Sequence, residues 1–313
     1  MVIFRQLNGI KHKFPRVIIA LGTFDGVHLG HQAIISRAVK AAREIKGTSV
    51  VLTFSRHPLS VIDPERAPKQ IVGFHQKASL IASLGVDVLL AIRPSPEFLK
   101  TPPERFIDLL FAQIDPLSIV IGPNYSFGFK GRGTPEMLSI AAARHGCKVE
   151  IHPIVEVGGV ICSSTMIRQF IAGGDMRNAA RLLGRPPSLY GRVVPGLQRG
   201  RTLGFPTANL NPPCGILLPP NGVYAATVDV EGRRFIGAAN IGINPTFKAF
   251  GEIYSRRVEV HLLNYTGDLY GKNIEVAFWD RLRPETAFST VDALKKQISE
   301  DINQTLAFFR NST

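Results

Sequence analysis

Two histidines stand close together at the start of a helical pattern, in the stretch GTFDGVHLGH (residues 22–31). The stretch follows RVIIAL (16–21), whose continuous Val, Ile and Leu content is typical of a strand buried on both faces. His28 and His31 could belong to a metal pair, a phosphate clamp or an ordinary helix start. No further cluster of His, Cys or carboxylates lies at a metal-ligand spacing. A phosphate is favoured, because a helix start attracts anions and the small Gly30 lets one approach closely.

Two more stretches of the first half end predicted strands and carry polar groups. TFSRHP (53–58) brings His57 to the end of a second strand, where the following proline alone would explain the strand's end. IGPNYSFGFKGRG (121–133) places Asn124 at a strand end, before a basic, glycine-rich loop that could equally be an exposed hinge. Carboxyl ends of parallel strands share one edge of a sheet, so these groups are expected near the two histidines.

The stretch SSTMIRQF (163–170) has the pattern of a capped helix start. Ser163 or Ser164 would cap the helix, and Arg168 lies one turn further on. Most stretches of this kind are only caps. The arginine adds a fixed positive charge on the same side, which suits an anion.

A glycine-rich loop marks the second half, in GLQRGRTLGFPTANL (196–210). Its backbone amides could cradle phosphates or simply form a hairpin, and it lacks the GxxxxGK[ST] pattern of a P-loop. The loop leads into PTAN, where Thr207 and Asn209 share one face of an extended segment. One hydroxyl and one amide oxygen suit a hard cation such as Mg²⁺. Glycine recurs at every fourth position, at Gly196, Gly200 and Gly204.

A polar stripe runs along RRVEVHLL (256–263). The alternation of apolar and polar residues predicts a strand with one buried face. The polar face, which is either solvated or part of a site, carries Arg257, Glu259 and His261.

The predicted secondary structure changes near the middle of the chain. Up to about residue 155, buried strands alternate with helical segments, which predicts a parallel α/β sheet. The predicted strands are 16–21, 48–54, 86–92, 117–122 and 148–154, and the predicted helices are 31–45, 75–85, 102–114 and 135–146. Two short helices are expected within 163–183, and GRPPSLYG (184–191) interrupts any helix. We therefore expect domains at 1–184 and 185–313.

Short strands separated by turns fill the second domain and predict an antiparallel barrel or sandwich closed by a helix over 290–309. The chain has 313 residues, and its hydrophobic content of 45% is ample for two cores. The net charge of +13 favours anionic partners, but the basic residues are scattered, without interleaved aromatics that would indicate nucleic acid. Three cysteines show no metal or disulfide pattern. With neither an evident signal peptide nor an apolar run of membrane-spanning length, we expect a cytoplasmic protein.

Taken together, the HxGH stretch, SSTMIR and PTAN resemble the bacterial bifunctional riboflavin kinase/FMN adenylyltransferase (FAD synthetase) family over nearly the whole chain. NIGINPTF, DLYGK and LRPETAF match this family as well. The resemblance implies a Rossmann-like nucleotidylyltransferase domain followed by a β-barrel kinase. It also implies ATP, riboflavin and FMN as substrates and Mg²⁺ as cofactor, with neither nucleic acid nor a membrane as partner. The oligomeric state is left open.

The resemblance also implies roles for particular residues. Glu259 becomes the candidate base for the ribityl 5′-hydroxyl, with Thr207 and Asn209 holding Mg-ATP. His28 and His31 would serve the α-phosphate during adenylyl transfer. The candidate ATP- and phosphate-binding residues are Gly22, Gly30, Asn124, Ser164, Thr165, Arg168, Gly196, Gly200 and Gly204, with His57 as a further member.

Two departures from the family pattern concern the first domain. Thr23 stands where the family commonly has Asn, and Arg56 where it commonly has Pro. The alternatives are a chain with one of the two activities, a transferase for another phosphate compound, or a basic nucleic-acid-binding protein.

Overall fold

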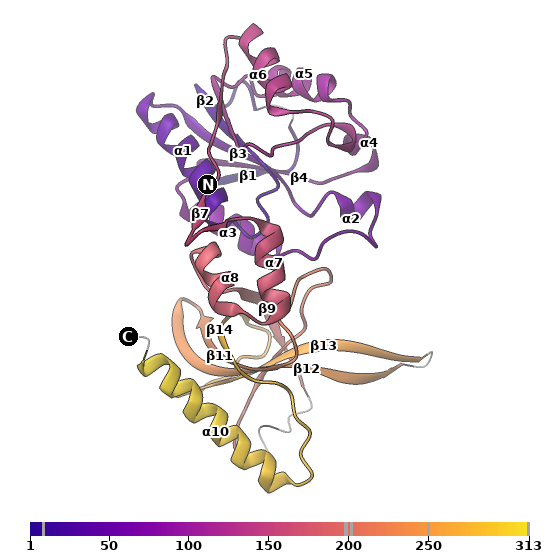
Figure 1. The fold of residues 1–313 in the computed structure, drawn as a ribbon, viewed down its shortest axis with the longest axis vertical. Helices are drawn as coiled ribbons and strands as arrows, with labels where there is room; N and C mark the ends of the chain where they lie inside the picture. Colours follow the sequence, from indigo (N-terminus) through magenta and orange to yellow (C-terminus); the bar gives the residue numbers. More distant parts are fainter. Residues whose placement is uncertain (8–9, 197–199, 201–202, 249–250, 312–313) are drawn as a thin grey trace. The chain divides into compact units, whose positions relative to one another are not determined.

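The computed structural model describes residues 1–7, 10–196, 200, 203–248 and 251–311. It divides into two compact units, Met1–Ser164 and Thr165–Thr313. Each unit has its own sheet (Figure 1). Among the helices of the described residues, none combines the length and the apolar character that crossing a membrane requires.

The first unit is built on a six-stranded parallel sheet, as the sequence predicts. The strand order is β1-β4-β3-β2-β5-β6, so the chain moves outward from β2 on one side and returns to β5 on its other side. In open sheets of this type, ligands bind where the strand order reverses, at the carboxyl ends. The strands are β1 Val2–Phe4, β2 Val17–Leu21, β3 Thr48–Phe54, β4 Val88–Ile92, β5 Ser118–Ile121 and β6 Lys148–Ile151.

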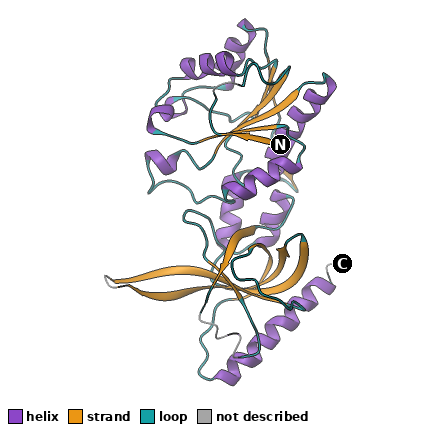
Figure 2. Cartoon of the chain, turned by 180° about the vertical axis from the view of Figure 1, so that it is seen from behind, coloured by secondary structure: helices purple, strands orange, loops and turns teal. Residues whose placement is uncertain are grey.

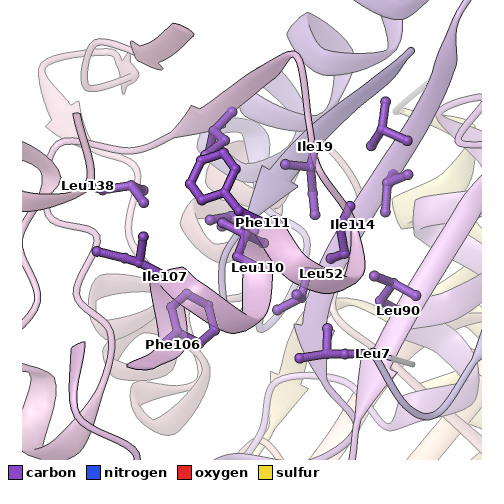
Figure 3. Packing of buried hydrophobic residues seen from close by; sticks show 14 of the residues in the cluster. Leu7, Ile19, Leu52, Leu90, Phe106, Ile107, Leu110, Phe111, Ile114 and Leu138 are labelled. Atoms are coloured by element: carbon purple, nitrogen blue, oxygen red, sulfur yellow. The ribbon is translucent and has the colours of Figure 1, made fainter. Parts of the chain in front are cut away.

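Helices cover both faces of this sheet (Figure 2). In β2, Ile19 belongs to the core cluster beneath α5 and α6, while Ile18 belongs to the cluster beneath α1 and α3. This double burial explains why the sequences of β2, β3 and β4 are almost continuously apolar. The prediction of a buried strand at 148–154 is wrong, because β6 lies at the edge of the sheet, ends at Ile151 and is exposed or half-buried throughout. Figure 3 shows the first cluster, where Phe106, Leu110 and Phe111 of α5 pack on the sheet. The helices are α1 Leu29–Glu44, α2 Leu59–Ile62, α3 Phe74–Ser83, α4 Pro96–Leu99, α5 Pro103–Gln113 and α6 Pro135–Arg144, with a 3₁₀ turn η1 at Phe129–Gly131.

The second unit contains a closed six-stranded antiparallel barrel, which decides between the two predicted β architectures. The strand order is β10-β13-β12-β11-β14-β9, and β10 pairs with β9 to complete the barrel. The long strands β12 and β13 extend beyond the others as a hairpin (Figure 1). The strands are β9 Ser188–Val194, β10 Ala208–Leu210, β11 Gly222–Val230, β12 Arg233–Lys248, β13 Gly251–Leu262 and β14 Asn273–Arg283.

Helices α7 Ser164–Gly173, α8 Met176–Leu183 and the terminal α10 Val291–Arg310 accompany the barrel. Helix α10 packs on β11, β12 and β14. Arg283 of β14 binds both carboxylate oxygens of the buried Asp301 at 2.7 Å, which attaches this helix to the barrel. A small hairpin, β7 Glu156–Val157 with β8 Val160–Ile161, lies in the first unit before Ser164.

Candidate functional site

Helix α1 begins with a histidine as its cap. His28 is the N-cap residue, and its Nδ1 accepts a hydrogen bond from the backbone N–H of His31 at 3.3 Å. The two imidazoles stack, with ring centroids 3.6 Å apart and planes inclined by 22°. Gly30 makes this possible, because a Cβ there would lie 3.2 Å from the His28 ring. The HxGH spacing therefore produces a paired imidazole surface at the helix start.

The same hydrogen bond determines where the proton of neutral His28 lies. A nitrogen that accepts from an N–H carries a lone pair, so Nδ1 is unprotonated and the proton belongs on Nε2. In this tautomer, His28 presents an N–H donor on the side of the ring away from the helix backbone. Such a donor suits an anionic phosphate oxygen.

The loop before α1 has an unusual backbone. Phe24 and Val27 both have positive φ, at 48° and 42°, which is costly for a side chain branched at Cβ such as Val. Burial of both side chains and hydrogen bonds to the loop stabilise this conformation. Asp25 accepts from the backbone N–H of Ile71, and the Thr23 carbonyl accepts from Thr53 Oγ1 at 2.8 Å.

A buried lysine lies beneath this loop. Lys77 of α3 is 2% exposed, and its Nζ donates to the carbonyls of Thr23 at 2.9 Å and Phe54 at 3.1 Å. Burial lowers the pKa of Lys77 to about 8, and the Asp25 carboxylate partly opposes that shift. Lys77 thus joins the loop after β2 to the end of β3.

These segments surround a pocket of about 680 Å³ at the carboxyl ends of β2, β3 and β5. Its volume falls within the roughly 300–1,000 Å³ of small-molecule sites. Its wall combines polar groups at the histidine end with aromatic and aliphatic side chains, including Phe54, Phe98 and Tyr125. Burial raises the pKa of Tyr125 well above its ordinary value, so its hydroxyl stays protonated. The predicted residues that line this pocket are Gly22, Gly30, His28, His31, Asn124 and Ser164.

Three other predicted residues are placed differently. His57 is half-buried and does not line the pocket, although the adjacent Pro58 and Leu59 do. Its Nδ1 accepts from the Leu59 backbone N–H at 3.2 Å, close to the start of α2. Thr165 and Arg168 lie on α7 within the second unit, whereas Ser164 Oγ donates to the Asp25 carbonyl at 2.9 Å.

In the barrel, Glu259 lies in a row with two asparagines. Glu259 lies on β13, and its direct cross-strand partners are Asn209 on β10 and Asn240 on β12. Cross-strand partners point to the same face, so the three polar side chains form one surface. The alternation predicted for β13 is confirmed, because Val258, Val260 and Leu262 are buried on the other face.

Asn209 contributes to this surface a buried oxygen that could bind a cation or accept a hydrogen bond from a ligand. The side chain is 5% exposed, and its Oδ1 is buried without a hydrogen-bond partner among the described residues. A buried carbonyl oxygen left in this state costs roughly 1–3 kcal/mol, a cost that a bound cation or donor removes. The half-buried Thr207 stands two residues before it.

Gly196 and Gly200 lie close to the PTAN segment. A Cβ at Gly196 would collide with the Asn209 side chain, and one at Gly200 would collide with the Phe205 carbonyl. Gly204 has φ of +91°, which favours glycine. His261, on the Glu259 face of β13, contacts the Pro206 carbonyl through Nδ1 at 2.7 Å. Residues 197–199 and 201–202 of the predicted phosphate loop lie outside the described residues.

Sequence reasoning missed Lys77, Asn240 and Cys162. Lys77 could have been found, since it stands four residues before Ile81 on the buried face of α3. Asn240 required the register between β12 and β13. Cys162 belongs to no metal or disulfide pattern, and no local pattern links it to His28, from which 134 positions separate it.

Comparisons with known proteins match both units. A family model described as FAD synthetase matches residues 10–166, and one described as riboflavin kinase matches residues 183–309. A protein of Listeria monocytogenes is 37% identical, over 93% of this chain and 92% of its own length. A protein of Bacillus subtilis is 34% identical, over 96% and 95%. Both are named bifunctional riboflavin kinase/FMN adenylyltransferase.

A solved structure shares the fold over nearly the full chain. It is the crystal structure of a Streptococcus pneumoniae protein described as a macrolide-efflux protein. The sequence identity is 33% and the TM-score is 0.85, with 97% of this chain and 99% of the other covered.

Proposed function

Since this chain belongs to the family of bifunctional riboflavin kinase/FMN adenylyltransferases, we propose that the pocket of its first unit and the polar row of its barrel perform the two reactions. The barrel phosphorylates riboflavin to FMN with ATP. The first unit then transfers AMP from a second ATP to FMN, which gives FAD and pyrophosphate. The observation that carries the assignment is the convergence of His28, His31, Asn124 and Ser164 on one pocket.

In adenylyl transfer, an oxygen of the FMN phosphate attacks the α-phosphorus of ATP. The new P–O bond forms as the bond to the pyrophosphate oxygen breaks, so the protein need supply no nucleophile. Its work is alignment and stabilisation of the charge that builds on the α-phosphate. His28 supplies the Nε2–H donor and His31 the second imidazole. Gly22 and Gly30 leave room at the backbone, and Asn124 positions the nucleotide or the flavin phosphate.

The departing pyrophosphate needs positive charge or donors of its own. We assign Ser164, Thr165 and Arg168 to this role, because all three belong to the first turn and a half of α7. His57 remains a secondary candidate through its neighbours Pro58 and Leu59, which line the pocket.

In the kinase reaction, Glu259 accepts the proton of the riboflavin 5′-hydroxyl as that oxygen attacks the γ-phosphorus of ATP. ADP leaves with the electrons of the broken P–O bond. Asn209 and Asn240 flank Glu259 on its two sides and hold it in place on the shared face. The amides near Gly196, Gly200 and Gly204 would receive the phosphates.

The residues of the barrel fit a magnesium ion. The buried Asn209 Oδ1 and the Thr207 hydroxyl are hard oxygen donors, and the former has no partner in the described chain. Thr207 and Asn209 would hold Mg²⁺ here, and the ion would supply positive charge that offsets the charge of the ATP phosphates. Among the described residues, no group of three His, Cys, Asp or Glu side chains could hold a metal, so the ligand set relies on these neutral oxygens and the nucleotide.

The division of labour is tested by the double variant His28→Ala/His31→Ala. Incubation with riboflavin, ATP and Mg²⁺, followed by chromatography, should show FMN accumulating at the wild-type rate and no FAD. Loss of both products in a folded protein would contradict the assignment of the histidines to one step.

The converse variant is Glu259→Gln, which keeps the shape of the side chain and removes its basicity. Removal of a general base typically costs about 10²–10⁴-fold in rate, so FMN formation should fall by that factor. FAD synthesis from added FMN should be unchanged and serves as the control for folding. Normal kinase turnover in this variant would exclude Glu259 as the base.

The family models support assigning residues 1–184 to adenylyl transfer and 185–313 to the kinase, because they match 10–166 and 183–309. From Thr165 on, helices α7 and α8 belong to the second compact unit. The requirement for ATP in both reactions supports a cytoplasmic location.

A further inference from the structure

One buried thiol contacts the machinery of adenylyl transfer without a role in the reaction as described. Cys162 follows β8 and lines the pocket beside Ser163 and Ser164. Its Sγ lies 3.4 Å from His28 Nδ1. Its backbone N–H donates to the Val155 carbonyl at 2.9 Å, which fixes its position on the small hairpin.

The sulfur also lies at the N-terminus of α1. The backbone N–H groups of Gly30 and Leu29 donate to it, while the N–H of His31 donates to His28. A helix leaves its first N–H groups without intrahelical partners, and here three of them are satisfied within the protein. The amides that the sequence offers to a phosphate are thus engaged, and the imidazoles become the donors that face the pocket.

The direction of the Cys162–His28 contact follows from the other bonds. Nδ1 of His28 accepts from His31 and therefore bears no proton. Burial raises the pKa of the Cys162 thiol, and this effect outweighs the opposing effect of the two backbone N–H groups, so the S–H persists at neutral pH. The thiol then donates to Nδ1, while its lone pairs accept from the helix.

We propose that Cys162 is a positioning residue for adenylyl transfer, which holds the His28 ring in place with its proton on Nε2. The proposal rests on the role of His28 assigned above. Loss of the thiol donor would remove one of the contacts that favour the unprotonated Nδ1, which would weaken the restraint on the orientation and tautomer of the ring. The Nε2–H donor would then be present in only a fraction of molecules.

The test measures the ring directly and the reaction separately. The full-length protein is labelled with ¹⁵N-histidine, and long-range ¹H–¹⁵N spectra are recorded for wild type, Cys162→Ala and Cys162→Ser, with His28→Gln to assign the signals. Wild type and Cys162→Ser should show the Nε2–H tautomer at His28. Cys162→Ala should show a shifted Nδ1 signal or a tautomer mixture.

The kinetic arm compares the two activities of each chain. We expect Cys162→Ala to lower kcat for FAD synthesis about tenfold with little change in KM for ATP, as loss of one orienting hydrogen bond would do. Cys162→Ser should recover most of the rate, and riboflavin phosphorylation should be equal in all variants. Cys147→Ala, which removes another buried thiol of the same unit, is the matched control and should leave kcat unchanged.

Two results would overturn the proposal. One is a wild-type spectrum that shows the proton on Nδ1 of His28. This result does not depend on whether any variant folds. The other is a Cys162→Ala protein with wild-type kcat and ring signals. If His28→Ala abolishes FAD synthesis in the same series, the proposed function stands even though this inference fails. Retained FAD synthesis in His28→Ala would instead refute the assigned role of His28.

Discussion

At the scale of the residue, the adenylyltransferase pocket depends on polar groups buried beneath it. Lys77 places an amine in the interior and uses it to hold the Thr23 and Phe54 carbonyls, both from residues that line the pocket. Burial removes water from the charged amine and thereby lowers the stability of the folded protein. The same loss of solvation lowers the pKa of Lys77 to about 8. Locally unfavourable features of this kind are common at functional sites, and here the buried amine fixes the loop that lines the pocket.

This cost predicts a particular dependence of stability on pH. The pKa of Lys77 is about 8 in the folded protein and 10.5 in its ordinary state. Between these two pH values the unfolded chain binds more protons than the folded one. Burial of the Lys77 amine therefore lowers the free energy of unfolding most below pH 8 and least above pH 10.5. The free energy of unfolding of wild type, relative to Lys77→Met, should therefore rise by about 2–3 kcal/mol from about pH 7 to about pH 10.

Urea unfolding followed by circular dichroism at each pH measures this difference. The matched control is Lys148→Met, an exposed lysine of the same unit, whose difference from wild type should stay constant with pH. A constant difference for Lys77→Met as well would show that its amine is not desolvated as the structure indicates.

At the scale of the element, the kinase site depends on how closely the glycine loop lies over β10. Gly196→Ala places a methyl group against the Asn209 side chain and forces one of them to move. Since misplacement of a site group by about 1 Å can cost about a hundredfold, riboflavin phosphorylation should fall by roughly that factor. FAD synthesis from added FMN, assayed on the same chain, should be unaffected.

A second glycine provides the comparison. A Cβ at Gly173, at the end of α7, meets nothing within 4 Å, so Gly173→Ala should leave both activities unchanged. Equal kinase rates in the two variants would mean that the loop does not hold Asn209 in place.

The elements also show what a sequence can predict. Strands β2 to β6, which have four to seven residues, and helices α1, α3, α5 and α6 follow from hydrophobic patterns that extend over several residues. The two-histidine motif follows from its place between β2 and α1. The hydrophobic pattern does not predict β1, because its three residues carry too little periodicity, and this strand exists through pairing with the distant β4. The same holds for side chains. Alternation places Glu259 on the polar face of its strand and the family resemblance selects it as the candidate base, whereas its partner Asn240 requires a register that only the closed barrel sets.

At the scale of the whole molecule, the excess of basic residues has a use in the reactions. The chain has 37 Lys and Arg against 24 Asp and Glu, which gives a net charge of +13. ATP and FMN are anions, whereas riboflavin is neutral at pH 7. A field from many scattered charges attracts anions over a distance set by the ionic strength, without the need for a basic stripe. FMN and riboflavin, the acceptors of the two reactions, are therefore a charged and an uncharged substrate in the field of the same protein.

We predict that kcat/KM for FMN falls by roughly threefold to tenfold between about 0.01 and 0.15 M salt, as the screening length shrinks from about 30 to about 8 Å. The value for riboflavin should change by less than about twofold over the same range, since a neutral molecule feels little of the field. Both are measured with ATP saturating, so that ATP's own charge cancels from the comparison. Parallel decreases for FMN and riboflavin would assign the salt effect to the protein or to ATP rather than to the acceptor's charge. Steering of FMN by the net charge would then be excluded, and the excess of basic residues would need another partner, which filter binding of nucleic acid over the same salt series would reveal.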